Sequence, residues 1–484
     1  MAKSLTKNSI FYLIYNVLNV LFPFVTGIYV ARVLLPDAIG EVAYAQNVVQ
    51  YFVIFAFLGI PTYGMREIAK ARKDKAELNK VYSELFVINL ISTAAFSVIY
   101  FSLIFIVPRF YENLVLYLIV GISLLLNALN NSWLYEGVEE FSFISIRNLI
   151  FKAVAFAFLV IFVRSEGDYL YYAAVTVVGT AGNYILNIAH AHKFVSFSFK
   201  DLNLKRHLKP IFMLVVVNLA IEIYTLVDVT MIGIFYPQDP QIVAYYSYGS
   251  KIEKILKQII TSFTMVLVPR ISLYHKEGKI DEFNDLLEKV LKIIFILACP
   301  MIVGLQFTSV FFLVKIYGEA YISSAYVLQI LSLILLVSPI GYLLGSRVLL
   351  VIGKESKMII AVGAGAILNI IGNAILIGPY KEYGAAIASV ISEIAVMVIY
   401  IFLARKYFKL KNIWGTAIKV FIASALVALY LFGCSYIPLG GWYVFAIQVI
   451  GAVAIYFITL LILKERIVVS NVNKIIGKFL KKKV

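Results

Sequence analysis

The sequence predicts an all-α integral membrane protein with about fourteen transmembrane helices, arranged as two pseudo-symmetric six-helix lobes plus two C-terminal helices. Of its 484 residues, 62% are hydrophobic and only 14% are charged, which is too apolar for a soluble domain. The apolar residues fall into runs of about 20 or more, the length that crosses a bilayer as a helix. A net charge of +16 would suggest nucleic-acid binding in a soluble chain, but the distribution of the basic residues, described below, argues against that class.

The spans can be placed from the apolar runs and the charged loops between them. We expect them at residues 9–35, 40–65, 81–107, 112–134, 143–163, 169–191, 210–236, 242–268, 288–314, 321–346, 357–378, 383–404, 413–436 and 442–463. Lys3 and Lys7 precede an apolar stretch too long for a signal-peptide core, so we expect it to be retained as the first span. Gly59-Ile60-Pro61 predicts a bend in the second span.

The distribution of basic residues predicts the orientation. Most of the 43 lysines and arginines fall at one predicted face, which the positive-inside tendency assigns to the cytoplasm. An even number of spans then puts both termini in the cytoplasm, and we expect a prokaryotic cytoplasmic (inner) membrane. Cys299 and Cys434 both lie inside spans and offer no disulfide framework.

An internal duplication is indicated by matching residues in the two halves. Ile10-Phe11 aligns with Ile211-Phe212, and Val42-Ala43-Tyr44 aligns with Val243-Ala244-Tyr245; with a small gap, Asn79 falls on Asn284. Six spans separate the copies, so both have the same orientation, which predicts lobes related by an axis along the membrane normal. The expected parts are an N-lobe (1–192), a basic linker (193–209), a C-lobe (210–404), the last two spans (405–463) and a basic cytoplasmic tail (464–484).

The stretch from Pro210 to Pro269 carries charges where hydrocarbon disfavours them. Its first helix contains Glu222 and Asp228, and its second contains Lys251, Glu253, Lys254 and Lys257. Each such group costs roughly 2.5–3.5 kcal/mol in a lipid-facing helix, so we expect them to pair or to face water. Equal depths on the two helices would pair Glu222 with Lys257 and Asp228 with Lys251.

The three lysines have two interpretations. At 100° per residue they form one stripe about 120° wide, so they can face one watered cavity that receives an anionic head group. Alternatively they are structural: Glu253 lies four residues before Lys257 and could be its partner within the helix. At the positions equivalent to Glu222, Asp228 and Lys251 the first lobe has Leu21, Gly27 and Gln50, so we expect the titratable groups to belong to the second lobe.

Other polar residues within spans are candidates with a structural alternative for each. Asn16 and Gln50 could contact a sugar or could join helices through hydrogen bonds. Arg32 could border the cavity and Lys419 could bind substrate, or both could extend to the membrane surface. Glu393 is a further buried acid that, with Glu222 and Asp228, could carry coupling ions. Asn369 and Asn373 share one helix face.

Three short motifs connect this chain with a known family. They are Ala31-Arg32-Val33-Leu34-Leu35-Pro36-Asp37-Ala38-Ile39-Gly40, Gly64-Met65-Arg66-Glu67-Ile68-Ala69 and Trp133-Leu134-Tyr135-Glu136-Gly137. With fourteen spans as six plus six plus two, the chain resembles the polysaccharide transporter (O-antigen flippase) family of the multidrug/oligosaccharidyl-lipid/polysaccharide exporter superfamily. The usual Leu-Gly before proline is Leu34-Leu35 here.

This resemblance implies the transfer of a polyprenyl-diphosphate-linked oligosaccharide to the outer leaflet by alternating access, without an ATPase domain or cofactor. It also implies a groove for the lipid tail at the last two helices. On this hypothesis the three lysines of the stripe receive the diphosphate. Partners would be the lipid-linked glycan, membrane lipids and a glycan polymerase or ligase, but no nucleic acid, and we expect a monomer.

Two alternatives remain open at this stage. An ion-coupled multidrug or cation antiporter of the same superfamily would favour a cavity dominated by carboxylates, whereas this one is dominated by lysines. A membrane glycosyltransferase or ligase would need a sizeable outer loop with paired carboxylates or metal ligands, and no predicted outer loop is long enough. The histidines are scattered at cytoplasmic ends, so we expect no metal site.

Overall fold

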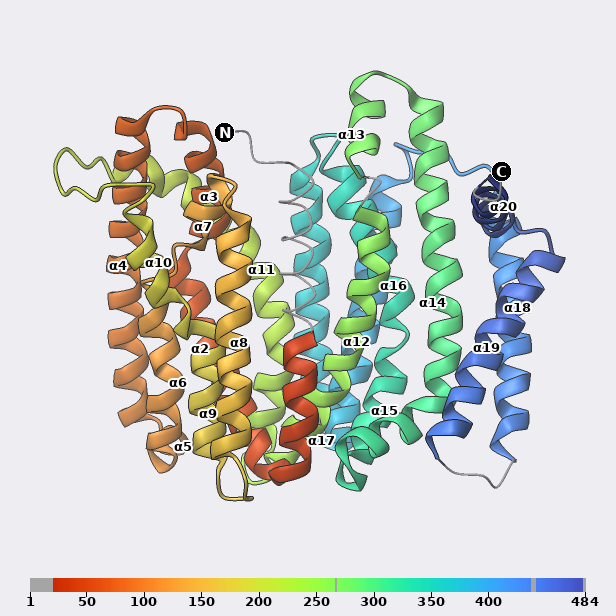
Figure 1. Ribbon diagram of the computed structural model, residues 1–484, viewed down its shortest axis with the longest axis horizontal. Coiled ribbons are helices and arrows are strands. Elements are labelled where there is room, and N and C mark those ends of the chain that lie inside the picture. The colour runs from red at the N-terminus through yellow and green to blue at the C-terminus, as the bar shows by residue number, and fades with distance from the viewer. Residues whose placement is uncertain (1–20, 266–267, 437–440, 482–484) are drawn as a thin grey trace. The chain divides into compact units, whose positions relative to one another are not determined.

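A computed structural model describes residues 21–265, 268–436 and 441–481, and its regular structure in these ranges is entirely helical (Figure 1). The chain divides into two compact units, Met1–Ala244 and Tyr245–Val484. The predicted all-α membrane fold is therefore confirmed. Each unit has its own buried core, one around Trp133 and the other around Phe283.

The first unit begins, within the described residues, with an apolar helix over Leu21–Val33. The helices that follow are α2 (Pro36–Phe57), α3 (Ile60–Ala71), α4 (Lys75–Ile106), α5 (Pro108–Glu112), α6 (Leu114–Asn127), α7 (Ser132–Gly137), α8 (Phe141–Phe162), α9 (Tyr169–Val177), the π-helix η1 (Val178–Gly182), α10 (Tyr184–Ala191) and α11 (Lys205–Phe235).

The second unit starts within α12 and ends with a helix rich in lysine. Its elements are α12 (Gln241–Met265), α13 (Val268–Lys276), α14 (Ile280–Tyr317), the 3-10 helix η2 (Glu319–Tyr321), α15 (Ile322–Leu331), α16 (Ile334–Tyr342), the π-helix η3 (Leu343–Leu349), α17 (Glu355–Ala404), α18 (Ile413–Ser435), α19 (Trp442–Ile462) and α20 (Arg466–Lys481).

Fewer than fourteen helices in the described residues meet the length and hydropathy expected of a span. Among the described residues, 8 helices are long and apolar enough to cross a membrane, or 9 if the pair Glu319–Leu331 and Ile334–Gly345, bent by 46°, is one span. The count of fourteen is therefore not confirmed. Part of the difference has a local cause: α17 joins the predicted spans 357–378 and 383–404 across a kink at Lys381, where φ is 51°.

Bends occur where the sequence predicts them. Pro36 occupies the first turn of α2, where a backbone N–H would have no partner within the helix. The negative charge of Asp37, in the same turn, interacts favourably with the positive end of the helix dipole. The helix ends at Phe57 because Leu58 and Gly59 both adopt left-handed backbone angles, with φ of 49° and 70°. Pro61 then lies in the first turn of α3. The predicted bend at Gly59-Ile60-Pro61 is confirmed.

Two of the sequence motifs pack against each other in the first unit. Gly64 of α3 lies against the indole of Trp133 in α7, so that a Cβ on Gly64 would be 2.8 Å from the ring. Gly137 lies equally close to Ile68. Any larger residue at either glycine would push α3 and α7 apart, which explains why small residues stand at these two positions of the motifs.

A polar latch ties the segment after α10 to the start of α4. The Asn79 side chain accepts a hydrogen bond from the Ser196 amide at 2.9 Å, and Glu84 accepts one from the Asn203 amide at 2.7 Å. Glu84, fully buried, also contacts Arg206 and His207. These bonds satisfy a carboxylate that would otherwise be costly to bury.

The second unit has the same latch at the start of α14. Asn284 accepts a hydrogen bond from the Lys409 amide at 3.0 Å, and Glu288 accepts bonds from the amides of Lys411 and Asn412 at 2.7 and 3.1 Å. Asn79 and Asn284, which the sequence alignment matched, thus hold equivalent segments. This agreement supports the predicted duplication.

The latch can be tested through stability. Replacing Glu288 by Ala leaves two backbone amides without an acceptor, so the free energy of unfolding should fall by about 1–3 kcal/mol. The measurement is the thermal midpoint of the purified protein in detergent. Glu282→Ala, at an exposed acid of the same helix, is the matched control and should leave the midpoint unchanged. Equal midpoints for the two variants would contradict the latch.

Candidate functional site

The three candidate lysines project from the middle of α12 in the second unit. Lys254 is exposed, whereas Lys251 and Lys257 are half-buried. The Lys251 Nζ lies 4.7 Å from the centroid of the Tyr248 ring, a cation–π distance. Tyr248 is itself held by Tyr317 and Tyr321, whose ring centroids lie 4.6 and 4.8 Å away. Buried aromatic rings therefore hold the tyrosine that Lys251, the first lysine of the stripe, contacts.

The carboxylates next to the stripe come from α12 and α17. Lys257 Nζ lies 3.0 Å from Glu253 Oε1, so the pairing within the helix that the sequence allowed is confirmed. Glu393 of α17 also acts electrostatically on Lys257. Lys257 therefore belongs to a local group of one cation and two acids. The proposed pairs Glu222–Lys257 and Asp228–Lys251 join the two units and stay predictions.

A chain of buried polar groups joins α12 to both arms of α17. The Tyr246 hydroxyl lies 3.5 Å from the Ser389 hydroxyl, Asn369 donates to Ser389 at 3.3 Å, and Asn373 donates to Asn369 at 3.3 Å. Asn369 and Asn373 share one helix face as expected. Since buried polar groups need partners, this chain fixes α17 beside the helix that carries the lysines.

The first-unit candidates lie on separate elements. Gln50 on α2 and Arg32 on the preceding helix are exposed. Asp228 of α11 is buried and acts electrostatically on Tyr51 of α2. The Tyr51 hydroxyl lies 2.9 Å from that of Thr230, which holds α11 against α2.

The side chains of two further candidates belong to the part of the first unit that the structure does not describe. Asn16 lies outside the described residues, and so does the side chain of Glu222.

The structure adds two basic residues that the sequence did not single out. Arg147 and Lys152 of α8 are only 4% and 7% exposed, so the first unit also buries titratable groups within a span. Lys152 Nζ lies 5.5 Å from the centroid of the Phe22 ring. The sequence signal was the position of Lys152 between apolar residues on both sides, about three turns into the helix.

Lys419 belongs to α18, and its ammonium group contacts the turn between α19 and α20. Its Nζ donates to the carbonyl of Lys464 at 3.1 Å and lies 3.8 Å from the carboxylate of Glu465. These contacts fit the structural alternative of a lysine near the membrane surface. A role for Lys419 in substrate binding stays a prediction.

An apolar groove of ≈ 390 Å³ opens among α14, α18 and α19. Pro300, Gly304 and Leu305 form its α14 side. The remaining lining comes largely from α18 and α19, namely Val427, Leu431, Gln448, Val449, Ala452, Val453, Tyr456 and Phe457. Leu256 of α12, the residue before Lys257, completes it. The helix with the lysine stripe therefore borders an apolar groove.

Metal ligands do not cluster in the described part of the chain. No group of three or more histidine, cysteine, aspartate and glutamate side chains there could hold an ion. What these helices provide is a set of cations, a few paired acids and an apolar groove.

Comparisons with known proteins identify the family of this chain. Residues 5–275, more than half of the chain, match the family described as "Polysaccharide biosynthesis protein". A relative from Escherichia coli (strain K12), described as "Putative O-antigen transporter", is 24% identical over 81% of this chain and 94% of its own length. A relative from Shigella dysenteriae with the same description is 24% identical over 81% of this chain and 98% of its own length.

Solved structures show the same fold. The lipid II flippase MurJ in an inward closed conformation has a TM-score of 0.71 at 16% identity and covers 93% of this chain and 97% of its own. An inward-facing multidrug resistance MATE family transporter has a TM-score of 0.65 at 15% identity, covering 80% of this chain and 93% of its own. The chain belongs to the polysaccharide biosynthesis protein family, and its apolar helices and the fold that it shares with these structures make it a multi-pass membrane protein.

Proposed function

We propose that this protein moves a polyprenyl-diphosphate-linked oligosaccharide from the cytoplasmic to the outer leaflet by alternating access. Two relatives carry a description as O-antigen transporters, and a structural neighbour flips lipid II. The function is transport, not catalysis. It requires a site for an anionic head group, a site for a long apolar tail and a way to neutralise charge within the membrane.

The observation that carries the proposal is that α12 offers both kinds of site. One of its faces carries the lysine stripe, and Leu256 on an adjoining face borders the groove of α14, α18 and α19. A diphosphate can accept several charge-assisted hydrogen bonds from ammonium groups, and these strengthen where water is excluded. A polyprenyl chain gains about 0.8 kcal/mol for each CH₂ that it buries in an apolar groove.

The candidate residues take distinct roles in this proposal. Lys251, Lys254 and Lys257 receive the diphosphate, and Asn16, Gln50 and Arg32 contact the sugars or the rim of the cavity. Lys419 would add a cation nearer the membrane surface. Glu222, Asp228 and Glu393 would exchange coupling protons, because a carboxylate next to a lysine can release its proton when the lysine's anionic ligand leaves.

We place the protein in the cytoplasmic (inner) membrane of a prokaryote with both termini in the cytoplasm. The end of the second unit that holds α13 and α20 carries exposed Arg270, Lys276 and Lys279 (Figure 1). Trp442 and Tyr443, which begin α19, are exposed aromatic residues of the kind found at membrane interfaces. Positive charge at one end supports the assignment of that end to the cytoplasm.

A second candidate function, antiport of lipophilic cations, is favoured by the fold match with a multidrug resistance transporter. Such a substrate would need uncompensated carboxylates in its cavity, whereas Glu253 is already paired with Lys257. Binding of a polyprenyl-diphosphate sugar and of a lipophilic cation to the purified protein separates the two functions. The proposal expects only the first to bind at micromolar concentration.

The stripe is tested by replacing Lys254 with Ala. Lys254 is exposed, so the fold should persist, while the loss of one charge-assisted bond of about 1.5–3 kcal/mol should weaken head-group binding about tenfold to 150-fold. Flipping of a lipid-linked oligosaccharide in proteoliposomes is the measurement. Lys276→Ala, at another exposed lysine of the same unit, should flip normally. Unimpaired transport by the Lys254 variant would refute the assignment.

The groove is tested by filling it. A Cβ on Gly304 would meet no atom within 4 Å, so Gly304→Phe can extend into the groove without displacing a helix. Excluding two methylene groups of the tail costs about 1.6 kcal/mol, so flipping of a long-chain substrate should slow roughly tenfold or more.

Gly433→Phe is the matched control, since Gly433 on α18 is equally unobstructed but does not line the groove. Head-group binding, measured with a short-chain analogue, should be the same in both variants and the parent. Equal slowing by the two phenylalanines would argue against a tail site in the groove.

A further inference from the structure

The final helix, α20, separates apolar and basic residues along its length. At 100° per residue, seven of its eight large apolar residues fall within an arc of about 140°, and its four basic residues fall within about 120° on the other side. Residues 466–484 contain six lysines and arginines and no acidic residue. This pattern is typical of a helix that lies along a membrane surface.

The turn before α20 is fixed by a buried carboxylate. Glu465, 3% exposed, accepts a hydrogen bond from the Thr416 hydroxyl at 3.1 Å and lies 3.8 Å from Lys419 Nζ. Lys464 adopts a left-handed φ of 52°, which lets the chain turn sharply after α19. In Figure 1, α20 is seen nearly end-on, whereas α18 and α19 run from top to bottom in the plane of the picture, so α20 lies crosswise to them.

One apolar contact also determines which side of α20 faces the protein. Val468 is buried in the core that Val420 of α18, Leu460 of α19 and Ile296 of α14 build. The opposite side of the helix, with Arg466, Ser470 and Lys474, is exposed. The fold thus presents the polar face of α20 outward.

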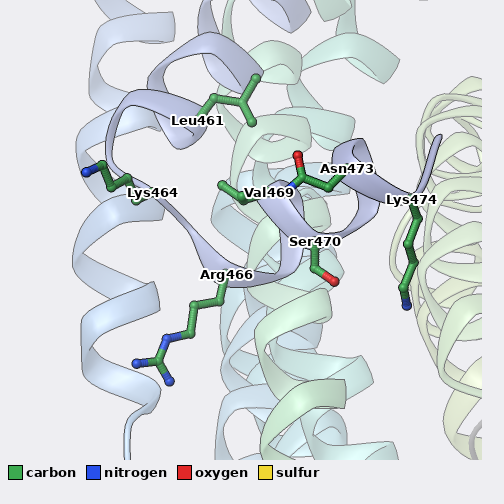
Figure 2. A pocket seen from close by; sticks show the side chains of 7 residues that line it. All are labelled: Leu461, Lys464, Arg466, Val469, Ser470, Asn473 and Lys474. Atoms are coloured by element: carbon green, nitrogen blue, oxygen red, sulfur yellow. The ribbon is translucent and has the colours of Figure 1, made fainter. Parts of the chain in front are cut away.

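That face forms an open depression of ≈ 1000 Å³. Figure 2 shows Lys464 and Arg466 at one side of it and Lys474 at the other, with Ser470 and Asn473 between them. Leu461 and Val469 add an apolar border. In the described residues no ion pair involves the three cations, and the neighbouring acid Glu465 is directed inward to Thr416. The depression is therefore suited to an anion with apolar substituents.

The position of the depression indicates the source of the anion. Leu461 belongs to the last turn of α19, next to Ile462, which is 72% exposed, and Trp414 near the start of α18 is 77% exposed. Large apolar residues so exposed on spanning helices face lipid tails, and tryptophan favours the level of the head groups. The three cations therefore lie where lipid phosphates are concentrated, with Leu461 toward the acyl chains.

We propose that α20 is a lipid-docking helix whose depression binds the phosphate of an anionic phospholipid in the adjacent leaflet, holding α18 and α19 at that surface. The lipid phosphate contacts Lys464, Arg466 and Lys474, while its glycerol and first acyl carbons contact Leu461 and Val469. Ser470 and Asn473 supply neutral hydrogen-bond donors. This role concerns a resident lipid and is independent of the transported substrate.

The test uses the full chain in detergent with a fluorescent label at Asn471→Cys, an exposed position just outside the depression, after Cys299 and Cys434 are replaced by Ala. Dioctanoyl-phosphatidylglycerol is titrated while label emission is followed. Each basic residue at an anionic surface contributes roughly fivefold to binding, so replacing Lys464, Arg466 and Lys474 by Gln should weaken binding at least about tenfold. Dioctanoyl-phosphatidylcholine should produce no comparable response.

A control variant with the same loss of charge carries Lys276→Gln, Lys289→Gln and Lys354→Gln, at exposed lysines of the same unit, and should bind as the parent does within about twofold. Inorganic phosphate should not compete at the concentrations at which phosphatidylglycerol saturates. Equal competition by inorganic phosphate would identify an aqueous anion site and overturn the lipid assignment. An unchanged affinity in the Lys464, Arg466 and Lys474 variant, or equal binding of phosphatidylcholine, would overturn the proposal as well.

Discussion

The cost of placing charge in hydrocarbon governs this structure more than any other constraint. A helix can cross the membrane with lysines and glutamates only if they pair, contact aromatic rings or face water. On α12 each solution is visible: Lys257 pairs with Glu253, Lys251 contacts Tyr248, and Lys254 is exposed. The neighbouring helices supply the partners that these charged side chains require. The buried polar chain from Tyr246 to Asn373 and the tyrosines behind Lys251 both serve to hold α12 in one position.

Local patterns predicted the features that depend on neighbours in sequence. The bend after Phe57 follows from Gly59 and Pro61, and the pair of Glu253 and Lys257 follows from their spacing of four residues. The equivalence of Asn79 and Asn284 was also visible, because the latch sits at the same point of each repeat. Such features need no knowledge of how distant helices pack.

Features that depend on distant contacts were missed. Glu84 accepts a hydrogen bond from the Asn203 amide, which is more than a hundred residues away in the sequence. No pattern near Glu84 predicts this partner. The burial of Arg147 and Lys152 depends on how α8 packs in the first unit, so the position of the two residues along the span did not reveal it. The count of fourteen spans is not confirmed in the described residues, because a charged or broken helix, such as the pair divided at Ser332 and Leu333, departs from the simple rule of 20 apolar residues.

The two latches also bear on how a transporter of this fold can move. All the partners of Glu84 given above belong to the first unit, and all those of Glu288 belong to the second. Rocking of one half against the other would leave both sets of bonds intact. Each latch can therefore stiffen its own unit through such a movement, and the boundary between the two units, after Ala244, lies within α12.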